Sequence, residues 1–146
     1  MSSSCLVLCP QCWMGDYCIV EFDGACKGNP GQGGAGAVIR DSTGVVVSRV
    51  REPLGFTTNN VAEYEGLIIG LKEALEMGYR DVHARADSQL VCKQVNGSWR
   101  VRSRNLYEYY ERAFVLIEML DRFEIQHVPR NCNTEADAEA NQAANM

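Results

Sequence analysis

The sequence predicts an α/β fold, in which helices flank one mixed five-stranded sheet and the elements follow the order βββαβααβα. Three observations lead to this prediction. Short Val- and Ile-rich stretches separated by glycines and turn residues fill the first third of the chain, which is typical of a hairpin meander. Beyond residue 58, segments with helical spacing of apolar residues alternate with strand-like segments, which indicates parallel strands joined by helices. A chain of 146 residues is also long enough for one domain with its own core.

The first three strands are expected at residues 17–22, 37–40 and 45–50. The second and third form a hairpin, and a glycine-rich loop ending at Gly36 separates the first two. This loop spells G-x-G-x-x-G from Gly31, but a strand-like segment follows it instead of the helix that a dinucleotide-binding loop needs. We therefore expect a loop whose backbone approaches a ligand closely.

The remaining elements are assigned by apolar periodicity and by stop signals. The first helix begins near residue 59 and ends at Gly78, and Asn96-Gly97 ends a short helix. The expected order is a helix at 59–78, a strand at 82–86, helices at 88–95 and 103–123, a strand at 124–128 and a helix at 133–144.

Composition excludes several classes of function. The formal net charge of −5 argues against a generally basic nucleic-acid coat, although local basic patches remain compatible with it. No apolar run is long enough to span a bilayer. Seven cysteines cannot all pair internally, and the first 15 residues contain no Lys or Arg. We therefore expect an intracellular protein of the cytosol or nucleus that is not secreted.

Residues 1–15 differ from the rest of the chain because they carry no charge and show no sustained periodicity. Cys5, Cys9, Cys12 and Cys18 have the spacing C-x3-C-x2-C-x5-C, which contains only one of the two close pairs of a zinc ribbon. Cys18 also falls inside a predicted strand. We favour a mobile leader over a zinc site, and place the folded domain at residues 16–146.

Four carboxylates fall where predicted elements begin or end. Asp23 and Asp87 end strands, whereas Glu63 and Asp137 lie in the first turns of helices. Strand ends and the helix starts that follow them form one crevice in such sheets. Acids that converge there repel one another unless a cation binds, and their oxygen atoms suit Mg²⁺ or Mn²⁺. The alternative is that these acids only interact with helix dipoles or form turns.

Four segments together resemble type 1 ribonuclease H, and the resemblance runs from about residue 16 to residue 145. They are FDGACKGNPGQGGAG at 22–36, TTNNVAEYEGL at 57–67, ADSQLV at 86–91 and NTEADAEAN at 133–141. The resemblance implies the ribonuclease H-like fold and a metal-dependent endonuclease that cuts the RNA strand of RNA–DNA hybrids, leaving 5′-phosphate ends. It also implies two Mg²⁺ ions, for which Mn²⁺ can substitute.

The resemblance further implies a role for each carboxylate. Asp23 would bridge both ions, and Asp137 would hold the ion that activates the water. Glu63 and Asp87 would hold the ion that supports the leaving 3′ oxygen. Such an arrangement suits an in-line displacement at phosphorus.

The substrate contacts of the family also map onto this chain. Residues expected to read the minor groove are Cys26, Gly28, Asn29, Asn60 and Gln89, and those expected beside the phosphate of the DNA strand are Thr58 and Asn59. Polar groups placed across a shallow minor groove can sense the 2′-hydroxyls of RNA. The alternative for Asn59 and Asn60 is that they cap the helix that follows.

Residues 88–107 contain Lys93 and three arginines and no acid, so this segment is a candidate phosphate-binding surface. We expect Arg100 and Arg102 to contact phosphates and Trp99 to pack against a deoxyribose. The alternative is a solvated loop with Trp99 half-buried.

The sequence departs from the family pattern at three places. The basic protrusion of many bacterial members is missing, as in compact archaeal and plant ribonuclease H-like domains. The loop before Asp137 is short, and we interpret His127 as a strand residue rather than a mobile histidine, with Arg130 partly in its place. Ala138-Glu139 replaces a more apolar pattern. A catalytically weak or inactive nucleic-acid-binding module is therefore the alternative function. We expect a monomer that needs no obligate protein partner and no membrane.

Overall fold

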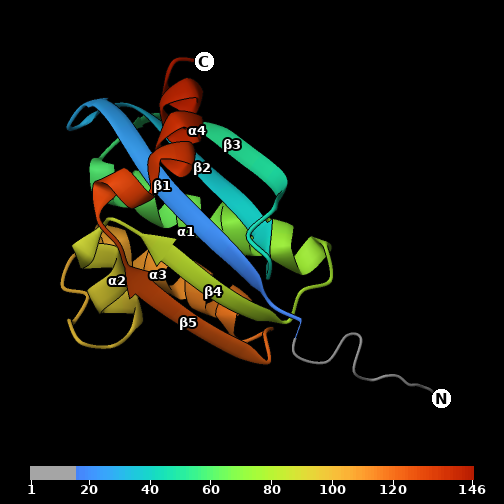
Figure 1. Ribbon diagram of the computed structural model, residues 1–146. Helices are drawn as coiled ribbons and strands as arrows, with labels where there is room; N and C mark the ends of the chain where they lie inside the picture. Colours follow the sequence, from blue (N-terminus) through green and yellow to red (C-terminus); the bar gives the residue numbers. More distant parts are fainter. Residues whose placement is uncertain (1–15) are drawn as a thin grey trace, which may run out of the picture.

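The computed structural model describes residues 16–146, which form one five-stranded sheet with strand order β3-β2-β1-β4-β5 (Figure 1). Strands β1, β2 and β3 pair antiparallel, whereas β4 pairs parallel with both β1 and β5. The predicted mixed sheet and the predicted order of elements are confirmed. The elements are β1 (Cys18–Gly28), β2 (Gly31–Asp41), β3 (Val46–Thr57), α1 (Asn59–Glu76), β4 (Asp81–Ala86), α2 (Gln89–Val95), α3 (Arg104–Ile117), β5 (Arg122–His127) and α4 (Thr134–Ala144).

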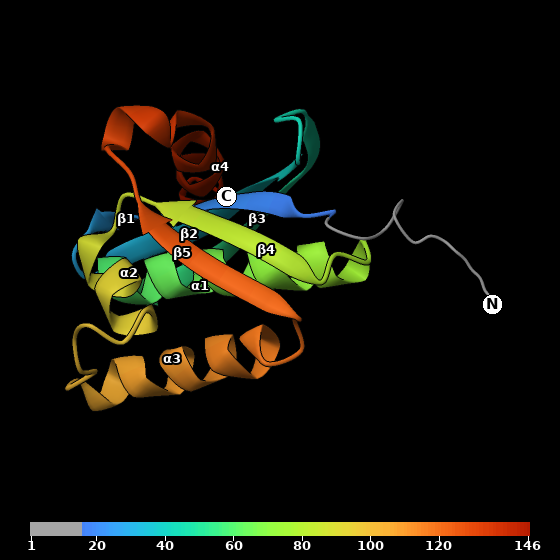
Figure 2. The ribbon, with the colours of Figure 1, turned by 60° about the horizontal axis from the view of Figure 1, so that its bottom comes forward.

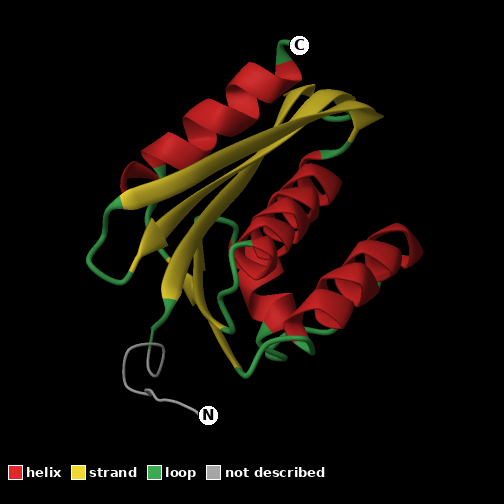
Figure 3. Cartoon of the chain, turned by 90° about the vertical axis from the view of Figure 1, so that its right-hand side faces the viewer, coloured by secondary structure: helices red, strands yellow, loops and turns green. Residues whose placement is uncertain are grey.

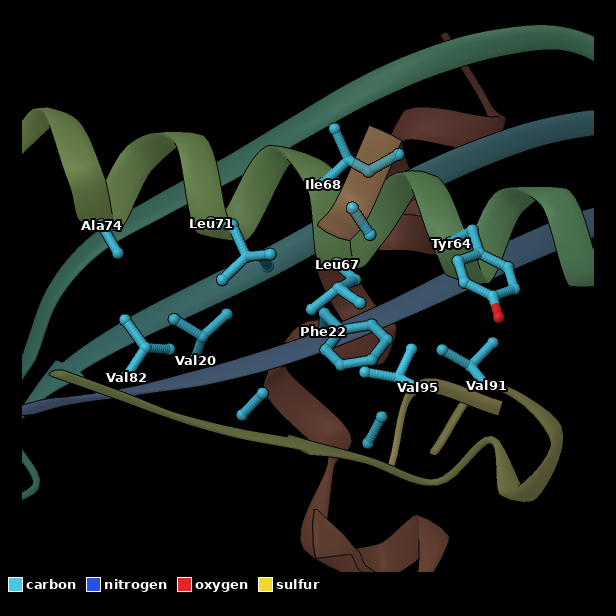
Figure 4. Close-up of a cluster of buried hydrophobic side chains, with 14 of the residues drawn as sticks. Val20, Phe22, Tyr64, Leu67, Ile68, Leu71, Ala74, Val82, Val91 and Val95 are labelled. Atoms are coloured by element: carbon cyan, nitrogen blue, oxygen red, sulfur yellow. The ribbon is translucent and has the colours of Figure 1, made fainter. Parts of the chain in front are cut away.

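The helices cover the two faces of the sheet unequally. Figures 2 and 3 show α4 on one face, with α1 and α3 on the opposite face. The main core lies between the sheet and α1, where Val20 and Phe22 of β1 meet Leu67 of α1 (Figure 4). Alternate residues of a strand face the same side, and the apolar stripe of α1 recurs every three or four residues, so the two patterns meet along one surface.

The predicted glycine-rich loop is wrong, because its residues are the paired ends of β1 and β2. Only Asn29-Pro30, joined by a cis peptide bond, separates the two strands. The glycines make room for α4: a Cβ at Gly34 would lie 2.2 Å from the backbone nitrogen of Ala144. A Cβ at Gly36 would lie 2.5 Å from the backbone nitrogen of Ala140. These glycines therefore bring a helix against the sheet, and not a ligand against a loop.

Two further boundaries differ from prediction. The third helix ends at Ile117 instead of residue 123, because the chain turns and β5 begins at Arg122. The backbone N–H groups of Asp121 and Arg122 both donate to the carbonyl oxygen of Arg80, at 2.7 and 3.1 Å, which starts the pairing of β5 with β4. Strand β3 is longer than predicted and runs through Pro53, which an edge strand tolerates.

The predicted leader at residues 1–15, with Cys5, Cys9 and Cys12, lies outside the described residues. Cys18 is fully buried in β1, which agrees with the prediction that its side chain belongs to the sheet. Between residues 16 and 146, no helix combines the length and the apolar character that crossing a membrane would require.

Candidate active site

A polar cavity of about 560 Å³ opens where β1, the start of α1 and the start of α4 meet. Three of the four predicted carboxylates line it, and Asp87 lies close enough to Asp23 to raise the pKa of that carboxyl group. The fold therefore brings together four acids that are up to 114 positions apart in the sequence. The lining residues are Asp23, Gly24, Ala25, Cys26, Asn29, Asn59, Asn60, Glu63, Arg130, Asp137 and Asn141.

Asp23 lies inside β1 and not at its end as predicted, because the strand continues to Gly28. Close packing of α1 across β1 brings Glu63 to this point. A Cβ at Gly24 would lie 2.3 Å from the backbone nitrogen of Glu63, and a Cβ at Gly66 would lie 2.4 Å from the carbonyl oxygen of Asp23. Two glycines on facing elements thus set how close the two carboxylates lie.

Burial and mutual repulsion perturb the acids of the cavity. Burial, the charge of Asp87 and a hydrogen bond with Asp137 raise the pKa of Asp23 to about 8. Burial and the charge of Asp87 raise the pKa of Glu63 to about 7, although a hydrogen bond from Ser88 opposes this rise. Such pKa shifts are common at functional sites, because catalysis or ligand binding often requires ionisable groups that are buried or close to a like charge.

Asp87 directly follows β4, as predicted, and its carboxylate has two polar partners. The side-chain Nδ2 of Asn133 donates to Asp87 Oδ1 at 3.0 Å, and Arg130 Nε lies 3.3 Å from Asp87 Oδ2. Asn133 is 1% exposed and was not predicted as a site residue. The sequence offered one signal for it: Asn133 lies four residues before Asp137, in the segment 133–141 that resembles ribonuclease H.

Several predicted substrate-contacting residues line the same cavity as the acids. Cys26, Asn29, Asn59 and Asn60 are among the lining residues. Asn29 Oδ1 accepts a hydrogen bond from the Asn59 backbone N–H at 3.1 Å, which joins the β1–β2 turn to the start of α1. Gly28 has a positive φ of 91° at this turn, a conformation that glycine adopts easily.

The residue that caps α1 is Thr58, whose side chain accepts from the backbone N–H of Val61 at 3.4 Å. The alternative in which Asn59 or Asn60 caps the helix is therefore wrong. Their side chains are not used for capping, so they are available to a ligand in the cavity.

The other predicted contacts lie apart from the acidic cavity. Trp99, Arg100 and Arg102 line a second hollow of about 540 Å³ together with Leu90, Gln94 and Ser98. Trp99 is 45% exposed, so part of its side chain is accessible. Gln89 is exposed at the first turn of α2 and lines neither of these two cavities.

His127 is the last residue of β5, which confirms its interpretation as a strand residue. Its Nε2 lies 3.3 Å from the backbone carbonyl oxygen of Asp87. Arg130, in the short 3₁₀ turn that follows β5, instead lines the acidic cavity.

The donor set of the cavity fits hard divalent cations. Carboxylates that raise one another's pKa are stabilised when a cation neutralises them, and oxygen ligands suit Mg²⁺ and Mn²⁺. Among residues 16–146, no group of three or more His, Cys, Asp or Glu side chains has an arrangement that could hold a metal ion as it stands. The fit therefore rests on the chemistry and the clustering of the donors.

The sheet order, the helix placement and the clustered carboxylates define an α/β protein with the ribonuclease H fold. Residues 21–143 match the family model described as reverse transcriptase-like, and the chain belongs to this family. The predicted resemblance to type 1 ribonuclease H is thereby confirmed.

Three similar proteins illustrate this relationship. Ribonuclease HI of Halobacterium salinarum is 43% identical over 122 residues, which cover 84% of this chain and 61% of the relative. The N-terminal RNase H domain of Rv2228c from Mycobacterium tuberculosis superposes with a TM-score of 0.87 at 38% identity, covering 90% of this chain and 95% of that one. LC11-RNase H1, solved in complex with an RNA/DNA hybrid, gives a TM-score of 0.83 at 34% identity, covering 88% and 96%.

This chain thus spans less than two thirds of the length of the Halobacterium relative. Dependence on divalent metals is general in the ribonuclease H family.

Proposed function

We propose that this chain is an endoribonuclease that cleaves the RNA strand of RNA–DNA hybrids and leaves 5′-phosphate and 3′-hydroxyl ends. One observation carries the proposal: three of the four carboxylates line a single cavity together with Cys26, Asn29, Asn59 and Asn60, which are among the residues expected to contact substrate. An acidic cluster alone would suit many cation-dependent activities. Its combination with Asn29, Asn59 and Asn60 favours a nucleic-acid substrate, since amide groups can donate to and accept from the 2′-hydroxyls and base edges of a minor groove.

Two Mg²⁺ ions, or Mn²⁺ in their place, would activate a water and stabilise the leaving oxygen when bound. Asp23, Glu63, Asp87 and Asp137 would hold them. Asp23 is the residue expected to be shared between the ions, and the other three carboxylates surround it from α1, from the end of β4 and from α4.

The surfaces around the cavity account for substrate binding in this proposal. Backbone and side-chain groups of Cys26, Gly28 and Asn29 at the β1–β2 turn would face the hybrid beside Asn60, and Thr58 and Asn59 would lie near a DNA phosphate. Gln89 would reach the minor groove from the start of α2. The second hollow, with Trp99, Arg100 and Arg102, would bind the backbone of the DNA strand.

Because this chain lacks the basic protrusion, we expect it to bind the hybrid more weakly than family members that have one. We also propose that the chain acts as an intracellular monomer, with residues 16–146 as the functional domain.

The test is cleavage of end-labelled duplexes of one sequence, prepared as RNA–DNA hybrid, duplex RNA and duplex DNA, with Mg²⁺ and separately with Mn²⁺. We expect cleavage of the hybrid alone, and loss of that cleavage in Asp23→Asn. Equal cleavage of duplex RNA would contradict the assigned selectivity. Tight binding of the hybrid without cleavage in either metal would favour the alternative, a binding module that does not cleave.

A further inference from the structure

Asn133 is a fully buried amide side chain beside the candidate active site, with 1% of its surface exposed. Its Nδ2 donates two hydrogen bonds, one to the backbone carbonyl oxygen of Phe22 at 2.9 Å and one to Asp87 Oδ1 at 3.0 Å. Both acceptors require a donor, so the orientation of the amide group is fixed by its partners. The side chain thus bonds directly to one acid and to the residue that precedes another.

The backbone of Asn133 reaches a third acid. Its carbonyl oxygen accepts the N–H of Asp137 at 3.1 Å, at the start of α4. One residue therefore connects β1 next to Asp23, the carboxylate after β4, and the helix that carries Asp137. These segments belong to three separate elements, which the side chain and the backbone of Asn133 join.

The side chain of Asn133 is not used for capping. Asn133 occupies the N-cap position of α4, where an asparagine oxygen ordinarily accepts a hydrogen bond from the first turn. Here the side chain makes no such bond, and its Oδ1 has no hydrogen-bond partner among residues 16–146. The amide of Asn133 therefore donates to Asp87 and to the backbone of Phe22, and it does not cap α4.

We propose that Asn133 is a positioning residue that fixes the carboxylate of Asp87 relative to the backbone beside Asp23 and at Asp137 for divalent metal binding. This inference rests on the proposed function, because it assigns the acids to metal ions. A donor held at Asp87 Oδ1 restricts rotation of that carboxylate and neutralises part of its repulsion with Asp23. Residues that hydrogen-bond to metal ligands commonly change metal affinity or activity by about 10–100-fold when they are replaced.

The test compares Asn133→Ala with Tyr64→Phe as a matched control. The Tyr64 hydroxyl donates to Gln94 Oε1 at 2.6 Å, so the control removes one buried hydrogen bond where Asn133→Ala removes two, and it does so on a side chain that does not line the acidic cavity. Three quantities are measured for each protein: Mn²⁺ affinity by titration calorimetry without nucleic acid, thermal stability in EDTA, and kcat and KM for hybrid cleavage.

We expect both variants to melt a few degrees below the wild type. Only Asn133→Ala should bind Mn²⁺ about tenfold or more weakly, and its kcat should fall while KM for the hybrid changes less than about twofold. Wild-type Mn²⁺ affinity in folded Asn133→Ala overturns the proposal, and so does an equal loss of affinity in Tyr64→Phe. If the alanine variant does not fold, Asn133→Ser is used, because serine is a good N-cap residue and its shorter side chain cannot bridge Phe22 and Asp87.

The calorimetric comparison also separates this proposal from the proposed function. A wild-type protein that binds Mn²⁺ but does not cleave hybrid contradicts the assigned activity, while the affinity difference between wild type and Asn133→Ala still decides the positioning role.

Discussion

Replacing Asp23 by asparagine should stabilise the metal-free protein at alkaline pH while abolishing hybrid cleavage. The pKa of Asp23 is raised from 3.8 to about 8 by burial, by the charge of Asp87 and by the neighbouring acids. The unfolded chain therefore loses this proton at a lower pH than the folded chain does. The protonated Asp23 carboxyl group therefore contributes stability that is fully present below about pH 4, and this contribution is lost progressively as the pH rises toward 8.

The magnitude follows from the size of the pKa shift. Each unit of pKa corresponds to about 1.4 kcal/mol, so the full shift from 3.8 to about 8 would cost about 6 kcal/mol above pH 8. Movement of neighbouring side chains and entry of water reduce this cost, and we expect Asp23→Asn to recover about 2 kcal/mol at pH 9. For a domain of this size that gain raises Tm by roughly 6 °C.

The assay is thermal unfolding in EDTA at pH 5 and at pH 9 for wild type, Asp23→Asn and Glu118→Gln. Glu118 is exposed just after α3, so its replacement changes the net charge equally without removing a buried acid. The advantage of Asp23→Asn over wild type should be clearly larger at pH 9 than at pH 5 and absent in Glu118→Gln. Adding Mg²⁺ should raise Tm of the wild type more than that of Asp23→Asn.

A folded Asp23→Asn protein that is no more stable than wild type at pH 9 would contradict the raised pKa of Asp23. A near wild-type cleavage rate in this variant would refute the two-metal assignment, since no other carboxylate can replace one shared between both ions.

Three other predictions concern the rest of the chain. Replacing Arg100 and Arg102 by alanine should raise KM for the hybrid and change kcat less. It should also reduce the slope of log affinity against log salt by about 0.7–0.9 per lost phosphate contact. An unchanged slope would mean that the two arginines are solvated side chains of the loop and contact no phosphate. Gly36→Ala should lower the free energy of unfolding by about 1–3 kcal/mol or more, measured by urea unfolding, because its Cβ would lie 2.5 Å from the backbone nitrogen of Ala140. Deleting residues 1–15 should leave Tm and hybrid cleavage unchanged, because that segment has no amphipathic pattern for docking; stoichiometric zinc that disappears with the deletion would show that its cysteines bind metal.

Much of the fold was predictable because its signals are local. The helical spacing of apolar residues in α1 and the breaks at Gly78 and Gly97 arise within one element, so they can be read from neighbouring residues. The glycine-rich segment was misread as a loop for the same reason. Glycine disfavours a strand locally, and nothing within the segment shows that Gly34 and Gly36 lie under the backbone of α4.

The sequence by itself determined the chemical identity of the candidate site, because the four acids and the amides beside them lie in recognisable segments at the ends or starts of predicted elements. Only the tertiary structure decided how they act together. The raised pKa of Asp23 depends on burial and on charges contributed by other elements, and the two bonds of Asn133 join residues 111 and 46 positions away. Such interactions depend on distance in space, and sequence spacing carries no information about that distance until the sheet and its helices have closed around the cavity.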